Sequence, residues 1–309
     1  MSHDLSHDKN ALPRLWDYTT RDHVRTAIAL AVEEDLGPLR RDITSQTLVP
    51  ESARTTAVMR SRQPGHLSGL ALLPEIVAAY DPAIALRVPM QDGQPIAPGE
   101  IAAEFAGPLR SILAMERIAL NFTTHLSGIA TLTAQYVALT QGTEARICDT
   151  RKTLPGLRAF QKYAVACGGG TNHRIGLYDA MLVKDNHIAH LSLQELPGAL
   201  ATAIASARRA SPAISFVEVE VDTLEQLALV LALPVDARPD MVLLDNMSPA
   251  LLKQAVLMRN AQATNVLLEA SGGVNLRTVA AIAQTGVDRI SIGALTHSAP
   301  SLDLGLDIA

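Results

Sequence analysis

Hydrophobic and polar positions follow different patterns in the two halves of the chain. From about residue 21 to residue 107, a stretch with apolar residues at helical spacing (HVRTAIALAVEEDLG) is mixed with strand-like runs such as TTAVMRS and IAAEFAG. Gly- and Pro-rich turns separate these segments, as is typical of an α+β module. The next segment, LRSILAMERIALNFTTHLSGIATLTAQYVALTQG, has apolar residues three and four apart and predicts a long helix.

After Gly142, short apolar runs alternate with helical segments. The strand-like runs are ARICD, AMLVKD, FVEVEVD, MVLLD, NVLLEA and DRISIGA. Apolar strands that alternate with helices predict a parallel sheet. Because about six units are visible rather than eight, an incomplete α/β barrel is favoured, with a doubly wound open sheet as the alternative.

Polar side chains or a glycine turn follow nearly every strand predicted in this half. They are Asp149 with Arg151 and Lys152, Lys184 with Asp185, Glu218 with Glu220, Asp245 with Asn246, Glu269 with Ser271, and Gly293. Parallel strands end at one edge of the sheet, where active sites form. Ordinary loop polarity explains one or two such positions but not easily six.

Positive charge is concentrated in one stretch, although the chain has a formal net charge of -5. The stretch holds Arg146, Arg151, Lys152, Arg158, Lys162, His173, Arg174 and Lys184, against only Asp149 and Asp179. A local excess of cations attracts a small polyanion. Nucleic acid fits less well, because it requires a broad basic face with interleaved aromatics, and aromatics are only 3% of the residues.

Composition favours a soluble, cytoplasmic protein. The 309 residues are 48% hydrophobic and sufficient for one large or two smaller domains. No apolar run approaches the roughly 20 residues that a membrane span needs, and the N-terminal MSHDLSHDKNALPRLWD lacks the apolar segment of an export signal. Cys148 and Cys167 have no CxxC spacing, so we expect free thiols.

Two adjacent pairs, Arg151-Lys152 and His173-Arg174, are candidates for anion binding. Arginine binds carboxylates in a bidentate manner and lysine offers a point charge, so their combination suits a ligand with more than one carboxylate or phosphate. A solvated charge run is the alternative. Asn186 and His187 follow Lys184 and would either orient it or provide a proton, with a role behind the residues that contact the ligand favoured over direct contact.

Glycine turns follow the last two predicted strands and predict a phosphate cradle. Ser271-Gly272-Gly273 precedes a helix expected from about Asn275, and Gly293 ends the final strand. Backbone N–H groups in such turns bind phosphate, and the last strand loops of barrels commonly do so.

Glu220 and Asp245 end neighbouring predicted strands. Two carboxylates there would hold Mg²⁺ or hydrogen-bond the hydroxyls of a ribose. Glu218 and Glu220 alternate with valines and share one face of their strand, so both need a cationic or metal partner if that face is buried.

Taken together, these motifs resemble the quinolinate phosphoribosyltransferase family. The matching segments are DTRKTLPGLRAFQKYAVACGGGTNHRIGLYDAMLVKDNHI, EVEVD, LLDNM, EASGGVN, TGVDRISIGALTHS and, upstream, RIALNF and LSGIATLT. The chain departs from the family pattern at GPLRRDITS. The resemblance implies an N-terminal α/β sandwich domain over residues 1–125, to which a tail at 297–309 returns, and an incomplete α/β barrel at 126–296.

The resemblance also implies the reaction of quinolinate with 5-phosphoribosyl 1-diphosphate and Mg²⁺, giving nicotinate mononucleotide, diphosphate and carbon dioxide in NAD biosynthesis. Arg151, His173 and Arg174 would bind the two carboxylates of quinolinate, with Lys152 and Lys184 nearby. Glu220 and Asp245 would engage ribose and Mg²⁺, and Ser271, Gly272, Gly273 and Gly293 the 5-phosphate. Arg117 would enter the site of the partner subunit in a homodimer, or in a hexamer built of dimers.

Three other functions remain open from the sequence. A related phosphoribosyltransferase acting on nicotinate or in molybdate-related metabolism would share the fold. A phosphosugar lyase or isomerase would use Lys184 as a Schiff-base nucleophile. A non-enzymatic anion-binding module would bind the ligand without turnover.

Overall fold

The computed structural model describes residues 13–211 and 213–308, so most of the polar N-terminal stretch lies outside the described residues. Contacts within the chain divide its described part into two compact units. Residues 135–151 and 171–293 make up what we call the barrel unit, and residues 13–134, 152–170 and 294–308 the N-terminal unit. The domain limits drawn from the sequence stay a prediction.

One six-stranded parallel sheet forms the core of the barrel unit. Its strands are β6 (Arg146–Cys148), β7 (Met181–Val183), β8 (Val217–Val221), β9 (Met241–Asp245), β10 (Leu267–Ser271) and β11 (Arg289–Ser291). Their order is β6-β11-β10-β9-β8-β7, and β6 and β7 do not pair within the described residues. Strands that are consecutive in sequence thus neighbour one another from β7 to β11, which is the order of an open barrel and not of a doubly wound sheet.

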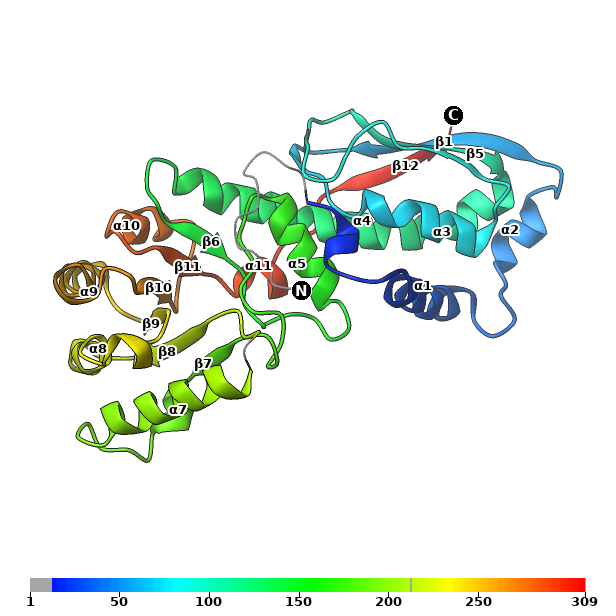
Figure 1. Cartoon of the computed structure of the whole chain (residues 1–309). Coiled ribbons are helices and arrows are strands. Elements are labelled where there is room, and N and C mark those ends of the chain that lie inside the picture. Colours follow the sequence, from blue (N-terminus) through cyan, green and yellow to red (C-terminus); the bar gives the residue numbers. More distant parts are fainter. Residues whose placement is uncertain (1–12, 212, 309) are drawn as a thin grey trace. The chain divides into compact units, whose positions relative to one another are not determined.

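The connecting helices of the barrel unit cover one side of this sheet (Figure 1). They are α6 (Asp185–Ile188), α7 (Leu196–Ala210), α8 (Leu224–Leu231), η3 (Val235–Ala237), α9 (Pro249–Gln262) and α10 (Val279–Ala283). Leu200, Ile204 and Val230 are buried on their inner faces. Thr223 begins α8 with a reciprocal capping box to Gln226, so the helix starts directly after β8.

An antiparallel sheet forms the core of the N-terminal unit. Its order is β12 (Leu304–Ile308), β1 (Arg54–Ser61), β5 (Ile101–Pro108) and β3 (Ala85–Arg87), and β2 (Gly65–His66) pairs separately with β4 (Pro95–Ile96). The C-terminal strand therefore pairs with β1, in a register from Ala57↔Ile308 to Ser61↔Leu304. Figure 1 shows α3 and α4 on one face of this sheet.

The helices of the N-terminal unit are mostly short. They are η1 (Leu15–Asp17), α1 (Arg21–Leu36), α2 (Ile43–Leu48), η2 (Leu70–Leu72), α3 (Leu73–Tyr80), α4 (Leu109–Leu139, whose last residues belong to the barrel unit), α5 (Arg158–Cys167) and α11 (Ala294–His297). The long helix predicted by its apolar spacing is confirmed as α4. No helix among the described residues has the length and apolar character required to cross a membrane.

Candidate active site

The carboxyl ends of the parallel strands bring the predicted polar residues to one edge of the barrel unit. Asp245 pairs with Ser271 across β9 and β10, and Glu220 pairs with Leu243 across β8 and β9. The residues that the structure collects at this edge are Arg151, His173, Arg174, Lys184, Glu220, Asp245, Ser271, Gly272, Gly273 and Gly293. We call this edge the rim.

A loop over residues 171–180 leads into β7, one edge strand of the open barrel, and starts beside β6, the other. At its start, the backbone N–H of Thr171 donates to Ile147 O in β6 at 2.7 Å. At its end, the N–H of Met181 donates to Phe216 O beside β8 at 3.1 Å. The loop that carries His173 therefore runs from β6 to the side of the sheet where β7 lies.

Two aspartates fix the backbone of this loop. The carboxylate of Asp149 accepts hydrogen bonds from Asn172 Nδ2 at 2.7 Å and from the backbone N–H of His173 at 2.8 Å. The carboxylate of Asp179 accepts from the backbone N–H groups of Ile175 and Gly176, which precede it, at 2.8 and 2.7 Å. Because charged acceptors make strong hydrogen bonds with backbone N–H groups, the residues between them are held in a defined conformation.

Arg151 and Arg174 place two guanidinium groups at the rim. Arg174 is buried, and its Nη1 donates to Ala180 O at 3.2 Å. Burial lowers the pKa of Arg174, and the neighbouring charge of Arg151 lowers it further. The Nε atom of Arg151 is buried and has no hydrogen-bond partner among the described residues. An unpartnered buried donor beside a second cation is costly unless an anionic ligand accepts from it.

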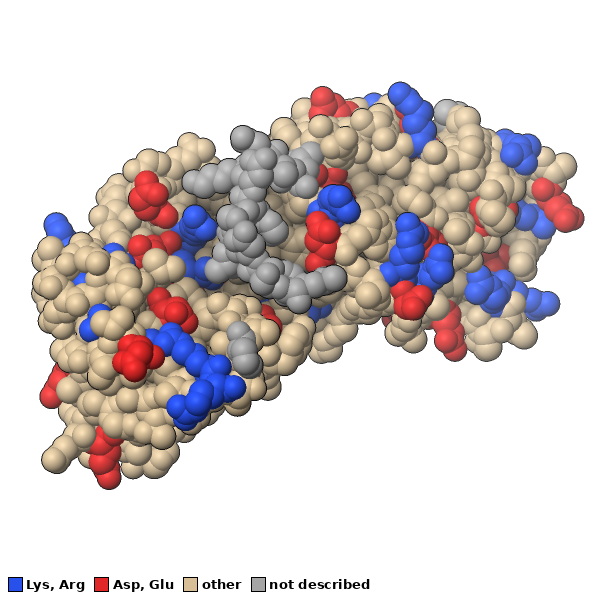
Figure 2. Space-filling model, in the orientation of Figure 1, with Lys and Arg blue, Asp and Glu red and all other residues tan. Residues whose placement is uncertain are grey.

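Much of the positive charge in the cationic stretch of the sequence is buried and does not form a broad basic surface. In the barrel unit His173 and Arg174 are each 7% exposed, and in the N-terminal unit Lys162 is 1% exposed. On the face drawn in Figure 2, Lys and Arg alternate with Asp and Glu. This arrangement favours a small anion over a nucleic-acid strand, which binds across an extended basic surface.

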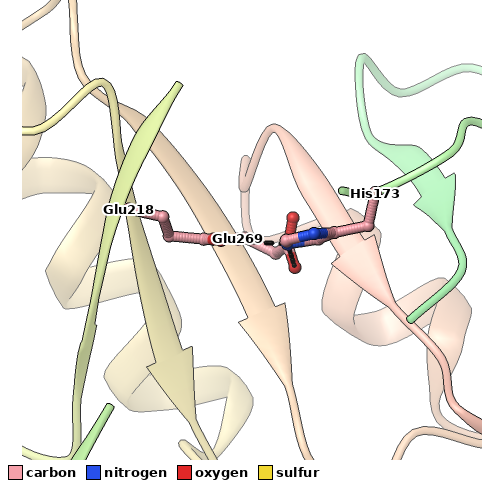
Figure 3. Close-up of side chains that lie close together, drawn as sticks. All are labelled: His173, Glu218 and Glu269. Carbon is pink, nitrogen blue, oxygen red and sulfur yellow. Dashed lines mark hydrogen bonds and ion pairs between the residues drawn. The ribbon is translucent and has the colours of Figure 1, made fainter. Parts of the chain in front are cut away.

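The His173 ring points its Nε2 edge toward two buried glutamates, as Figure 3 shows. Its Nε2 is 2.9 Å from Glu218 Oε2 and 3.4 Å from Glu269 Oε1. Arg289 Nε donates to Glu269 Oε2 at 2.8 Å. The edge of the His173 ring packs against Phe216, with the ring centroids 5.4 Å apart. We call His173, Glu218, Glu269 and Arg289 the buried network; both glutamates are fully buried.

Charges within the buried network shift the pKa values of its members. Burial raises the pKa of Glu218, and the carboxylate of Glu269 raises it further. Burial also raises the pKa of Glu269, but His173 and Arg289 outweigh that effect and bring its pKa to about 2. Glu269 is therefore an anion paired with Arg289 at neutral pH.

Two effects on the protonation of His173 oppose each other. Burial lowers the pKa of the ring, but the interactions with Glu218 and Glu269 outweigh it and raise the pKa to about 9. The backbone N–H of Arg174, however, donates to Nδ1 at 2.8 Å, and a proton on Nδ1 would abolish this hydrogen bond. Because the short contact needs a lone pair on Nδ1, we assign the neutral tautomer with its proton on Nε2.

His173, Glu218 and Glu269 also form, within the described residues, a group of three whose ligand atoms lie within 4.8 Å of one another. Their arrangement does not fit a metal site. Nε2 directs its proton toward Glu218, and Glu269 already binds the guanidinium of Arg289. The protein's own donors thus occupy the positions that a cation would take.

The other carboxylates of the rim also have cationic or amide partners. Lys184 Nζ is 2.9 Å from Glu220 Oε2, and Asn246 Nδ2 donates to Asp245 Oδ2 at 2.6 Å. The requirement that Glu218 and Glu220 find cationic or polar partners is met by His173 and Lys184, respectively. His187 Nδ1 accepts from the backbone N–H of Lys184, and the orienting role of His187 stays a prediction.

The turn after β10 requires glycine. Gly272 has φ +91°, and a Cβ at this position would lie 2.2 Å from Asn246 Oδ1. Gly273 has φ +63° but open space around it. The prediction of a helix from about Asn275 is wrong, because Asn275–Thr278 form a hydrogen-bonded turn and α10 begins at Val279. The backbone N–H groups of the turn, and not a helix dipole, are thus what it offers to a phosphate.

Arg117 and Lys152 belong to the N-terminal unit. Arg117 is exposed on α4, and the backbone carbonyl of Lys152 accepts from Thr296 Oγ1 at 2.7 Å. In the same unit, Arg158 Nε donates to Thr153 Oγ1 at 3.0 Å. Both cysteines are buried free thiols, as expected from their spacing.

Sequence reasoning missed the part that Glu269 and Arg289 play. The sequence marks Glu269 only as a residue near a strand end and indicates no role for Arg289. A signal was available, because each charge interrupts an apolar run (NVLLEAS and DRISIG) and neighbouring buried strands must pair such charges. The structure pairs Glu269 with Arg289 at the same level of β10 and β11.

Two family models together match nearly the whole described chain. The model for the N-terminal domain of quinolinate phosphoribosyl transferase matches residues 42–127, and the model for its C-terminal domain matches residues 129–307. The chain belongs to the quinolinate phosphoribosyl transferase family. Both the antiparallel sheet and the rim of the parallel sheet thus fall within the matched residues.

Relatives of the same length carry names from this family. The chain is 44% identical over 295 residues to the nicotinate-nucleotide pyrophosphorylase [carboxylating] of Mycobacterium leprae (strain TN), covering 93% of this chain and 98% of the relative. It is 38% identical to a probable enzyme of the same name from Bacillus subtilis (strain 168), covering 89% and 90%. The solved structure of the nicotinate-nucleotide pyrophosphorylase from Francisella tularensis has a TM-score of 0.84 at 36% identity, covering 97% and 99%.

Proposed function

We propose that this protein transfers the phosphoribosyl group of 5-phosphoribosyl 1-diphosphate to quinolinate, with decarboxylation, and thereby makes nicotinate mononucleotide for NAD biosynthesis. Membership of the family and the names of its full-length relatives support this reaction. The observation in this chain that carries the proposal is the guanidinium pair at the rim. Arg174 is buried beside Arg151, whose buried Nε has no partner among the described residues.

The guanidinium pair fits quinolinate better than nicotinate. Quinolinate carries carboxylates on two adjacent ring carbons, whereas nicotinate carries one. Two neighbouring cations repel each other in a partly desolvated site, and a dicarboxylate offsets both charges. A monocarboxylate would leave one guanidinium without a counter-charge. His173, in the same loop, belongs to this part of the site.

Positioning and electrostatics perform the chemistry. The guanidiniums hold quinolinate so that its ring nitrogen faces C1 of the ribose, which favours displacement of diphosphate. Glu220 and Asp245 face the ribose and stabilise the positive charge that develops at C1, while Lys152 and Lys184 neutralise anionic groups. Once the ring nitrogen is bonded to C1 and positive, the adjacent C2 carboxylate leaves as carbon dioxide, and the ring takes up a proton at C2.

The 5-phosphate of the sugar is bound by the last two strand loops. Ser271, Gly272 and Gly273 present backbone N–H groups after β10, and Gly293 follows β11. The positive φ of Gly272 and the close approach of Asn246 give this turn a conformation that residues with a Cβ would not adopt easily. Backbone donors of this kind bind phosphate without an additional side chain.

Mg²⁺ fits the two carboxylates at the ends of β8 and β9. Each uses one oxygen in the hydrogen bonds described above, and Glu220 Oε1 and Asp245 Oδ1 accept none from a described residue. Carboxylate oxygens are suitable ligands for Mg²⁺, which commonly binds one or two carboxylates together with substrate phosphates. When bound, the ion neutralises negative charge on the diphosphate.

We place the active enzyme in the cytoplasm as a homodimer in which Arg117 completes the site of the partner subunit. The exposure of Arg117 on α4 supports this arrangement. Mixing inactive Arg117→Ala and Arg151→Ala proteins tests it, because a mixed dimer regains one intact site and the mixture about one quarter of the activity. No recovery after subunit exchange would contradict a shared site.

A direct assay separates this function from its rivals. Purified protein is incubated with 5-phosphoribosyl 1-diphosphate, Mg²⁺ and either quinolinate or nicotinate, and nicotinate mononucleotide is measured by chromatography. Product from quinolinate alone is expected. Product from nicotinate alone would instead support the related phosphoribosyltransferase. The Schiff-base reaction is disfavoured because Lys184 Nζ is engaged by the carboxylate of Glu220 at 2.9 Å, whereas such a nucleophile has to be available to the substrate.

A further inference from the structure

The backbone around Lys152 is held at two points by side chains of the N-terminal unit. Thr296 Oγ1 in α11 donates to the carbonyl of Lys152 at 2.7 Å. Two residues later, the backbone N–H of Leu154 donates to Gln161 Oε1 in α5 at 2.9 Å. Both side chains that hold the backbone are buried, since Thr296 is 1% exposed and Gln161 is 0% exposed. The path of residues 152–154 is therefore fixed at both ends, although Lys152 itself is exposed.

Gln161 joins these two contacts into one network. Its Oε1 faces the N–H of Leu154, which can only donate, so Nε2 carries the amide hydrogens toward Thr296 O at 3.1 Å and His125 Nε2 at 2.9 Å. Burial lowers the pKa of His125, which keeps the ring neutral and leaves Nε2 able to accept. The oxygen and both hydrogens of the amide are thus used within the unit. We call Thr296, Gln161 and His125 the Lys152 clamp.

The helices that carry the clamp are themselves fixed in the N-terminal unit. α5 and α11 lie side by side (Figure 1), and His125 belongs to the long helix α4. Leu295 in α11 is fully buried, and after α11 the N–H of Leu302 donates to Thr124 O in α4 at 2.9 Å. A buried polar network whose members are satisfied stiffens the structure around it. The position of the clamp is therefore set by the packing of three helices and not by the loop that it holds.

A lysine depends on its backbone for direction. Its ammonium group is a point charge at the end of a flexible four-carbon stem, without the planar fork that orients an arginine. The position of the Lys152 backbone therefore decides which anionic groups its charge can reach. Displacement of a functional group by about 1 Å can reduce catalysis about 100-fold, so fixation of this backbone has a direct effect on the reaction.

We propose that Thr296, Gln161 and His125 are positioning residues that direct Lys152 toward an anionic group of the substrates. This inference rests on the proposed function, in which Lys152 neutralises such groups. It assigns a role to three residues outside the rim, and it gives the C-terminal segment that carries α11 a part in the reaction.

A double-mutant cycle tests whether the Thr296 hydroxyl acts through Lys152. Lys152→Met shows which substrate depends on the lysine, and Thr296→Val, which removes only the hydroxyl, should lower kcat/KM for that same substrate about tenfold. Thr296→Ser keeps a hydroxyl and should lower it less than about twofold. Added to Lys152→Met, Thr296→Val should cost less than about twofold more, because the residue that it positions is gone. Additive losses, or no loss in Thr296→Val alone, would overturn the proposal.

Gln161→Met gives a second test, because it keeps a similar volume but removes the amide that joins the two contacts. Its effect on kcat/KM should also disappear in the Lys152→Met protein. Thr123→Val is the matched control: Thr123 is equally buried, and its Oγ1 donates to Ala119 O at 2.7 Å within α4. We expect Thr123→Val to change kcat/KM by less than about twofold. Equal losses in Thr123→Val and Thr296→Val would contradict the proposal, since both would then report a general loosening of the unit.

Circular dichroism and thermal unfolding show which variants are folded, and calorimetry gives the Kd of quinolinate and of 5-phosphoribosyl 1-diphosphate independently of turnover. If the unchanged protein binds the two substrates without converting them, the proposed function fails, while the coupling between Thr296→Val and Lys152→Met in these Kd values still tests the clamp. If Lys152→Met changes neither kcat/KM nor Kd, the clamp proposal fails while the proposed function stands. If the unchanged protein binds neither substrate, both fail.

Discussion

Glu269→Gln is the most informative single substitution for stability, because it changes charge with little change in shape. Glu269 Oε2 accepts from Arg289 Nε at 2.8 Å, and both side chains are buried. Removing one member of a buried ion pair leaves the other charge without a partner, which typically costs about 3–5 kcal/mol. We expect the free energy of unfolding at neutral pH to fall by about this amount.

The same interaction makes the stability difference depend on pH. Hydrogen bonds from His173 and Arg289, together with the charge of Arg289, outweigh burial and hold the pKa of Glu269 below its ordinary value of 4.5 in the folded protein, so ionised Glu269 stabilises the fold. Because the folded pKa is depressed, this contribution is fully present above pH 4.5 and is lost as the pH falls toward 2. The advantage over Glu269→Gln should therefore shrink across that window.

Urea unfolding followed by circular dichroism measures the difference, at a fixed protein concentration so that any association affects both proteins equally. The measurements run from pH 7 to the lowest pH at which both proteins still fold. Replacing both members, as in Glu269→Leu with Arg289→Met, serves as the control and should recover much of the loss. Equal unfolding free energies at pH 7, or a difference independent of pH, would refute the reasoning.

Three further outcomes are expected. Gly272→Ala should raise the KM for 5-phosphoribosyl 1-diphosphate and lower the free energy of unfolding in urea by about 1–3 kcal/mol, because its Cβ would meet Asn246. The matched Gly273→Ala has open space around it and should lower the free energy of unfolding by only about 1 kcal/mol. Similar effects of the two substitutions would contradict this explanation. Arg151→Ala should lower kcat/KM for quinolinate by an amount equivalent to about 2–4 kcal/mol of transition-state binding. Near-normal turnover would show that Arg151 does not bind a carboxylate of quinolinate. Lys184→Met should lower kcat/KM by tenfold or more in steady-state assays, and borohydride should trap no substrate on the unchanged protein; trapping would revive the Schiff-base reaction.

The sequence predicted the rim well because the rim follows from local rules. Apolar strand runs fix where each strand ends, and parallel strands place those ends at one edge, so Glu220 and Asp245 reach the same place without knowledge of side-chain geometry. The buried network was harder to predict from the sequence. Its members are far apart in sequence, and which nitrogen of His173 faces which carboxylate depends on how the loop over residues 171–180 meets the sheet.

Local signals also failed at the helix after Gly273. The segment has a helical apolar pattern, but hydrogen bonds from Thr278 and Val279 to Asn275 O make a turn first, and only Val279–Ala283 are helical. Helix ends are weakly determined by sequence because capping, turn and helix conformations satisfy the same backbone groups. The glycine turn nevertheless lies where predicted, since its position depends on the end of β10.

The measurement that tests the central claim most directly is release of carbon dioxide from quinolinate labelled at the C2 carboxylate. The protein is incubated with 5-phosphoribosyl 1-diphosphate and Mg²⁺, and labelled carbon dioxide and nicotinate mononucleotide are counted together. We predict one carbon dioxide for each nucleotide, with both products lost in Arg151→Ala. Nucleotide formed without release of the label, or no nucleotide from quinolinate, would contradict the account.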